Sequence, residues 1–248
     1  KEEFGETLRY YGTRLARLGV DVRLHTHAQA ADLANHDAVV LATGILPRVP
    51  AIDGIDHPKV ASYVDIVSGR RVAGARVAIV GAGGIGFDVA ELLTHPGDHA
   101  DTVAEFNEQW GIDPSYAHPG GVKPPVPARS PRQVFLLQRK ASKVGEGLAK
   151  TTGWIRRTLL KQRGVTMLGG VEYLRVDDAG LHVAVDGAAR VLDVDTVVIC
   201  AGQEPRRELV DALASVGKAA TLIGGADVAV ELDAKRAIEQ GTRVAMAL

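Results

Sequence analysis

The chain has 248 residues, a formal net charge of -1 and a single cysteine. The near balance of 29 basic and 30 acidic side chains argues against a protein whose overall positive charge binds nucleic acid or an acidic membrane. The length suits one large or two smaller domains, and no apolar run approaches the ~18 residues of a membrane span. Because one cysteine forms neither an internal disulfide nor a redox pair, we expect a soluble, cytoplasmic protein.

The N-terminal segment predicts a helix and then a strand. Residues 3–18 carry apolar side chains at spacings of three and four, which is typical of an amphipathic helix that ends at Gly19. Residues 20–24 alternate apolar and polar side chains, which predicts a half-buried strand. His25 and His27 follow, but with no third ligand nearby we favour solvated or capping histidines over a metal site.

Two stretches share one pattern, in which an apolar strand runs into a small-residue turn and then a proline. The first is the strand 37–44, which ends in Thr43 and Gly44 and is followed by Pro47. The second runs through residues 196–205. Such a strand end can bring backbone close to a dinucleotide, although an ordinary strand and turn explain the first stretch equally well.

The most informative stretch lies between these two. The β-branched run 76–80 enters the Gly-x-Gly-x-x-Gly turn of residues 81–86, and an amphipathic helix pattern follows. In such a turn Gly81 permits the tight bend, Gly83 lets the backbone approach a pyrophosphate, and Gly86 lets the helix pack close to the strand. The free N–H groups of the first helical turn face the anion. The stretch therefore predicts a dinucleotide site.

The next strand predicts which dinucleotide binds. Residues 97–132 first form a long excursion rich in proline and glycine, of a kind that is usually functional or mobile. The strand 133–138 then ends in Arg139 and Lys140. A site for NAD places an acidic residue there, whereas an arginine accommodates the 2′-phosphate of NADP. We therefore favour NADPH over NADH, the alternative being a solvated basic loop.

The rest of the chain alternates short elements. It predicts a helix over 154–160, strands over 165–168, 171–176, 181–185 and 196–200, and a hairpin turn over 177–180. The strand 221–223 then delivers Gly224-Gly225-Ala226-Asp227 to a helix over 231–240. This arrangement places an acid and backbone amides where a flavin nucleotide could bind, and a capping aspartate is the alternative.

Several stretches in order along the chain resemble the C-terminal region of the bacterial NADPH-dependent 2,4-dienoyl-CoA reductases, iron–sulfur flavoproteins related to trimethylamine dehydrogenase. The resemblance is carried by residues 1–4, 7–11, 52–60, 83–88, 108–113, 130–133, 137–143, 150–155, 198–205 and 231–238. Several of these stretches are loops of unusual sequence, and together they extend over essentially the whole chain.

The resemblance implies an α/β fold with two Rossmann-like nucleotide-binding domains of the pyridine-nucleotide-disulfide-reductase type, three-layered around a central parallel sheet. It implies an FAD-binding domain formed by residues 1–72 and 208–248 and an inserted NADPH-binding domain formed by residues 73–207. The first strand and Gly-x-Gly-x-x-Gly turn of the FAD domain would precede Lys1, so we expect that domain to be incomplete and FAD to lose its pyrophosphate cradle.

The resemblance also assigns the cofactor sites. NADPH is assigned to Gly81, Gly83, Gly84, Gly86, Arg139, Lys140, Ala201, Gly202 and Gln203, and FAD to Ala28, Thr43, Gly44, Gly225 and Asp227. FMN and a 4Fe–4S cluster are expected only in an N-terminal barrel, the implied partner, which this sequence lacks. Electrons would pass from NADPH through FAD, the cluster and FMN to the dienoyl thioester. We predict no catalytic side chain and no metal ligand, because the cofactors carry the chemistry.

Two other functions are weighed against this one. The first is a non-catalytic ADP-binding or assembly domain, as in relatives of trimethylamine dehydrogenase. Such a domain would not need cations like Arg139 and Lys140, because ADP has no 2′-phosphate for them to bind. A disulfide reductase would need a dithiol, whereas Cys200 ends a buried strand and is more simply a core residue. We therefore expect the isolated chain to bind NADPH but not to reduce an enoyl-CoA.

Overall fold

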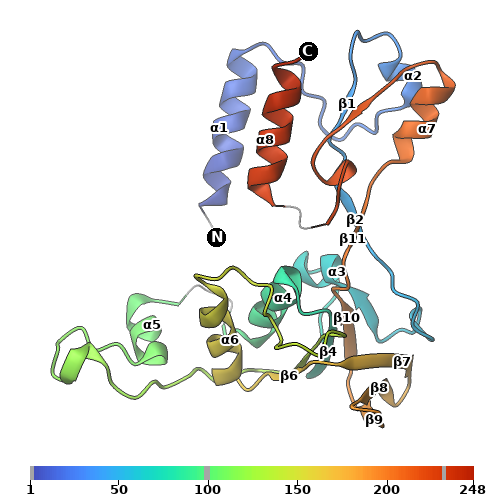
Figure 1. Ribbon diagram of the computed structural model, residues 1–248. Helices are drawn as coiled ribbons and strands as arrows, with labels where there is room; N and C mark the ends of the chain where they lie inside the picture. Colours follow the sequence, from blue (N-terminus) through green and yellow to red (C-terminus); the bar gives the residue numbers. More distant parts are fainter. Residues whose placement is uncertain (1–2, 98–100, 231–232) are drawn as a thin grey trace.

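A computed structural model describes residues 3–97, 101–230 and 233–248, which form an α/β structure around a central parallel sheet (Figure 1). The sheet has five strands in the order β3-β10-β4-β5-β6, and every neighbouring pair is parallel. These strands are β3 (Val60–Ser62), β4 (Arg76–Val80), β5 (Gln133–Leu137), β6 (Thr166–Leu168) and β10 (Thr196–Ile199). Strands 76–80, 133–138, 165–168 and 196–200 of the sequence analysis are therefore confirmed as elements.

Helices cover one face of this sheet (Figure 1). They are α3 (Tyr63–Val67), α4 (Gly84–Thr94) and α6 (Gly153–Gln162). Phe87, Val89 and Leu93 of α4 are buried in one cluster with Ile79 and Leu136 of the sheet. Burial of such large apolar side chains stabilises the layer by about 1.5–3 kcal/mol each.

An antiparallel meander covers the other face. It consists of β7 (Val171–Asp177), β8 (Gly180–Val185) and β9 (Ala188–Leu192), the last of which was not predicted. Ala78 and Val80 of the sheet share a buried cluster with Leu181 and Val183 of the meander. Helices, parallel sheet and meander make three layers, which confirms the predicted fold class. The predicted hairpin turn is also confirmed, since Asp177 pairs with Gly180.

A second group of elements surrounds a parallel pair, β1 (Val40–Leu41) and β12 (Thr221–Leu222). Val39, Leu41 and Leu213 form its small core. The group includes α2 (Ala30–Leu33), α7 (Glu208–Ser215), the 3-10 turn η2 (Gly224–Ala226) and α8 (Ala234–Ala245). The helix predicted over 231–240 corresponds to α8, although residues 231–232 lie outside the described residues.

One antiparallel ribbon links the two groups (Figure 1). Its strands are β2 (Ile45–Pro47) and β11 (Gln203–Pro205), with Gln203 opposite Pro47 and Pro205 opposite Ile45. The division into domains 1–72 with 208–248 and 73–207 stays a prediction. Because β3 pairs with β10 in the central sheet, the pairing favours a first boundary before Val60.

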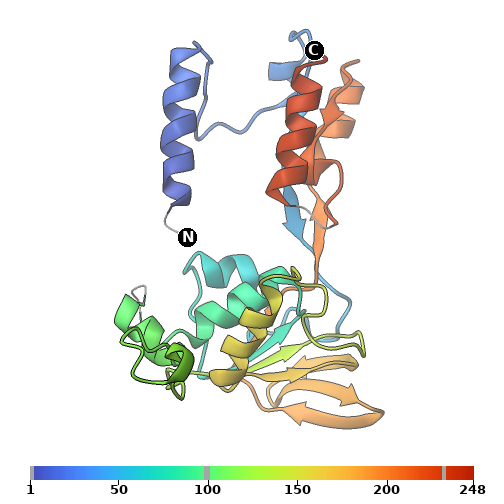
Figure 2. The same cartoon turned by 60° about the vertical axis from the view of Figure 1, so that its left-hand side comes forward.

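The N-terminal segment differs in part from expectation. The predicted helix is present as α1 (Phe4–Arg17), which stands apart from the other elements when viewed as in Figure 2. The strand predicted over 20–24 is wrong, because no strand lies beside this segment among the described residues. Val22 and Leu24 are instead 50% and 75% exposed. An alternating pattern gives a stable strand only where a neighbouring strand pairs with it.

The long excursion of residues 97–132 contains the 3-10 turn η1 (Pro119–Gly121) and, before it, a helix that was not predicted, α5 (Val103–Trp110). Thr102 and Glu105 form a capping box at its start, and Gly111 ends it with a φ of 65°. Whether the excursion is functional stays a prediction. No helix in the described ranges has the length and apolar character to cross a bilayer.

Three carboxylates make the stability of the fold depend on pH. Hydrogen bonds, chiefly from Ser115 to Asp113, from Arg175 to Asp177 and from Arg76 to Asp195, hold the pKa of each carboxyl below the ordinary value of 3.8. Groups whose pKa is lowered by folding stabilise the native state above the unfolded value, and this contribution is lost as the pH falls toward the folded pKa.

We therefore expect the free energy of unfolding to fall as the pH is lowered from about 5 to about 3, over the window set by these lowered pKa values. Urea unfolding at several pH values measures this, and the variants D113N and D195N should show a shallower decline. A free energy of unfolding that stays constant down to about pH 3 would contradict the assignment.

Candidate nucleotide site

A cavity of about 700 Å³ lies where β4, β5 and β10 end. Ligands of open α/β sheets bind at this carboxyl edge of the strands. All the residues assigned to NADPH from the sequence line the cavity except Gly86, namely Gly81, Gly83, Gly84, Arg139, Lys140, Ala201, Gly202 and Gln203. Three segments that are distant in the sequence thus meet in one place.

The glycines of the turn over residues 81–86, which we call the central turn, have different structural roles. Gly81 adopts a φ of 113°, and a Cβ atom there would lie 2.4 Å from the Cys200 carbonyl oxygen. A Cβ atom at Gly86 would lie 1.9 Å from the Gly81 carbonyl oxygen. A Cβ atom at Gly83 or Gly84 would meet nothing within 4 Å. Gly81 and Gly86 therefore make the turn possible, whereas Gly83 and Gly84 leave open space beside the cavity.

Helix α4 begins at this turn with Gly83 as its N-cap and has no acidic side chain in its first turn. The first intrahelical bond runs from the Phe87 N–H to the Gly83 carbonyl, at 3.1 Å. The N–H groups that precede Phe87 in the helix have no intrahelical acceptor. Because Gly84 and Ile85 line the cavity, these donors and the positive end of the helix dipole are available to an anion.

A basic edge lies at the end of β5. The Gln138 side-chain amide donates to the carbonyl oxygens of Lys140 at 2.9 Å and Ser142 at 2.6 Å, which fixes the loop that follows the strand. Arg139 and Lys140 are exposed, and neither forms an ion pair with any described residue. Both cations are therefore available to a phosphate on the ligand.

Arg48 also lines the cavity, and sequence reasoning missed it. Its Nε donates to the Ala201 carbonyl oxygen at 2.8 Å, and its backbone N–H donates to Gly202 at 3.1 Å. Arg48 follows the ribbon strand β2 and reaches a turn that lies 153 positions along the chain. Only its place just after the strand, turn and proline unit could have drawn attention to it.

Tyr173 is the second lining residue that sequence reasoning missed. It lies on β7, and burial raises the pKa of its phenol while the charge of Arg139 lowers it to a smaller extent. The phenol therefore stays protonated at neutral pH. Alternating apolar side chains predicted the strand, but they carry no signal that this tyrosine faces a cavity.

The residues assigned to FAD lie elsewhere. Thr43 follows β1 and Gly225 follows β12, and since these strands are parallel the two residues share one sheet edge. The Thr43 hydroxyl donates to the Arg206 carbonyl at 2.6 Å, and Asp227 accepts from the Gln240 amide at 2.7 Å. The polar side chains of this group therefore already have protein partners, and the FAD role of Ala28, Thr43, Gly44, Gly225 and Asp227 stays a prediction.

The two small-residue turns lie at opposite ends of the β2–β11 ribbon. The Arg206 N–H donates to Gly44 at one end of the β2–β11 ribbon, and the Arg48 N–H donates to Gly202 at the other. The antiparallel register places Gly44 and Gly202 on either side of the three residue pairs, four residue steps or about 13 Å apart along the ribbon at strand spacing. The shared pattern brings the two units together as a ribbon.

Cys200 also lines the cavity, but as a core thiol. It is buried, and desolvation raises the pKa of its thiol to about 12. Because the thiolate is the reactive form, we expect a thiol-exchange reagent at pH 8 to modify the native chain at least about 100 times more slowly than the urea-unfolded chain. Equal rates would contradict this burial. Within the described ranges no three metal-ligating side chains gather to hold an ion.

Comparison with known proteins agrees with this architecture. A sequence model of the pyridine nucleotide-disulphide oxidoreductase family matches residues 11–225. The metal reductase of Desulforamulus reducens is 27% identical over 226 residues, which cover 88% of this chain and 33% of that protein. The bilirubin reductase of Mediterraneibacter gnavus is 31% identical over 110 residues, which cover 44% and 17%. The chain thus spans a third or less of these relatives.

Solved structures show the same fold. A 2-naphthoyl-CoA reductase in complex with 2-naphthoyl-CoA superposes with a TM-score of 0.76 at 22% identity, over 99% of this chain and 32% of that one. The 6-hydroxypseudooxynicotine amine oxidase of Pseudomonas geniculata superposes with a TM-score of 0.70 at 19% identity, over 92% and 31%. In both cases the shared region is about a third of the larger protein.

Proposed function

The chain belongs to the pyridine nucleotide-disulphide oxidoreductase family, and from that premise we propose that it is the NADPH-binding, electron-input portion of a flavin-dependent reductase. Membership of the family implies FAD and a nicotinamide nucleotide. The observation that carries the proposal is one cavity that joins the N-terminus of α4 to two cations after β5, neither of which forms an ion pair with a described residue.

The residues present fit an NADP nucleotide. Open space beside Gly83 and Gly84 admits the pyrophosphate, and the first N–H groups of α4 donate to it. The guanidinium of Arg139 can donate two parallel hydrogen bonds to the 2′-phosphate, and the ammonium of Lys140 adds a second positive charge. Arg48 holds the Ala201 carbonyl and so fixes the turn that borders the nicotinamide half. The bound nucleotide supplies a hydride, and the chain supplies its position and its shielding from water.

We further propose that the whole protein is a 2,4-dienoyl-CoA reductase of unsaturated fatty-acid oxidation. The sequence resemblance supports this substrate, and the structural neighbour that was solved with an aromatic CoA thioester is compatible with it. In such a protein FMN and a 4Fe–4S cluster would lie on a barrel domain that is not part of the residues described here. We therefore expect the isolated chain to leave a dienoyl-CoA unreduced.

The affinities of the purified chain for 5′-ADP and for 2′,5′-ADP, measured separately, test the nucleotide assignment. Two charge-assisted hydrogen bonds, from Arg139 and Lys140, contribute about 1.5–3 kcal/mol each, so the extra phosphate should tighten binding at least about 100-fold. Isothermal titration calorimetry measures both constants. Equal affinities would favour the alternative function, a non-catalytic ADP-binding or assembly domain.

A further inference from the structure

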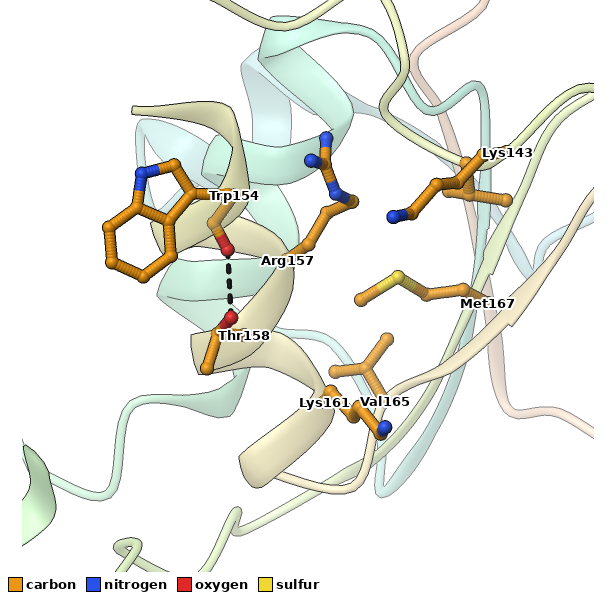
Figure 3. Close-up of a pocket in the computed structure, with 8 residues that line it drawn as sticks. Lys143, Trp154, Arg157, Thr158, Lys161, Val165 and Met167 are labelled. Carbon is orange, nitrogen blue, oxygen red and sulfur yellow. Dashed lines mark hydrogen bonds between the residues drawn. The ribbon is translucent and has the colours of Figure 1, made fainter. Parts of the chain in front are cut away.

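A second cavity, of about 520 Å³, lies beside the first between α6 and the edge strand β6 (Figure 3). It is lined by Lys143, Val144, Trp154, Arg157, Thr158, Lys161, Val165 and Met167. The loop after β5 separates the two cavities, since Ser142 and Gly145 line the first while Lys143 and Val144 line the second.

Three cations border this second cavity. Lys143 and Lys161 form no ion pair with any described residue, and Arg157 donates from Nη1 to the Gly145 carbonyl at 2.8 Å. The lining contains no acidic side chain. In a chain with a net charge of -1, such a grouping leaves a local positive potential that favours an anion.

The remaining wall is apolar. Val144 and Val165 are 7% and 8% exposed, and Met167 points across the cavity toward α6, as does the ammonium group of Lys143 (Figure 3). Methionine adapts its shape to a ligand more readily than a branched side chain does. An anion without an apolar body would leave this wall in contact with water, and a neutral apolar molecule would leave the cations unpaired.

We propose that this second cavity is a binding site for an organic phosphate with an apolar body, distinct from the nucleotide site. The phosphate lies between Lys143, Arg157 and Lys161, where a dianion meets three positive charges. The body lies against Val144, Val165 and Met167. Neither the central glycine turn nor Arg139 takes part, so the proposal stands independently of the NADPH assignment.

Phenyl phosphate is a suitable probe, because Trp154 lines the cavity and the chain's other tryptophan, Trp110, lies on α5. In the variant W110F, Trp154 fluorescence should change saturably on titration with phenyl phosphate. Inorganic phosphate should bind at least about 10-fold more weakly, since it lacks the apolar body, and phenol should give no saturable change.

Two sets of variants complete the experiment in the W110F background. The double variant K143Q/K161Q should weaken phenyl phosphate binding at least about 10-fold. R190Q, which removes an exposed cation on β9, and R139A should leave it unchanged. The proposal is overturned if no saturable response is seen or if K143Q/K161Q binds as tightly as its parent. It is equally overturned if R139A abolishes the response, because the probe would then occupy the nucleotide cavity.

Discussion

The double variant R139A/K140A should bind NADPH at least about 100-fold more weakly than the parent chain while its affinity for NADH stays within about two-fold. At the end of β5 the two cations line the cavity and form no ion pair within the described part of the chain, and NADPH differs from NADH by the one phosphate that they would contact. Two charge-assisted contacts of about 1.5–3 kcal/mol each account for the expected loss. Isothermal titration calorimetry with both nucleotides measures the effect.

Two controls sharpen this expectation. R139K keeps the charge but loses the planar fork, so its affinity for NADPH should lie between those of the parent and the double variant. R190A removes an exposed cation far along the chain on β9 and should change neither affinity. If R139A/K140A weakened NADH and NADPH equally, the two side chains would contact a part common to both nucleotides.

Alanine at two glycines of the central turn should lower the free energy of unfolding to different extents. G86A places a Cβ atom 1.9 Å from the Gly81 carbonyl oxygen, so the turn or α4 must shift, and overpacking of this kind costs about 1–3 kcal/mol or more. G83A meets nothing within 4 Å at a φ of -81°, so its free energy of unfolding should fall by no more than about 1 kcal/mol, the usual cost of a changed N-cap.

Binding should separate the same two variants. The added methyl group of G83A would stand where we propose that the pyrophosphate approaches the backbone, so NADPH affinity should fall about 10-fold or more in a chain that remains folded. Urea unfolding and calorimetry on the same preparations measure both quantities. The two roles would be wrongly assigned if G86A were as stable as the parent, or if G83A bound NADPH with unchanged affinity.

Local sequence was sufficient wherever an element depends on its own residues. The turn between β4 and α4 was predicted because glycine spacing and apolar periodicity lie within one short stretch, from Arg76 to Leu93. The cations after β5 were predicted for the same reason, since their position follows directly from the strand. The cavity that unites them confirms that the parts lie together, and family membership confirms the fold.

Features that depend on distant partners were not predictable in this way. The contact of Arg48 with Ala201 joins segments 153 positions apart, and nothing in the sequence of either segment predicts that they meet. Residues 20–24 have the alternation of a strand but lack a neighbour among the described residues. The shared strand, turn and proline pattern gave no sign that the two units pair with each other, whereas β2 and β11 form one antiparallel ribbon.

A crystal structure of the chain with NADP+ tests the central claim most directly. We predict the pyrophosphate at the first N–H groups of α4, beside Gly83 and Gly84, and the 2′-phosphate within hydrogen-bonding distance of Arg139 and Lys140. A nucleotide bound outside this cavity, or one whose 2′-phosphate points into solvent away from both cations, would contradict the assignment.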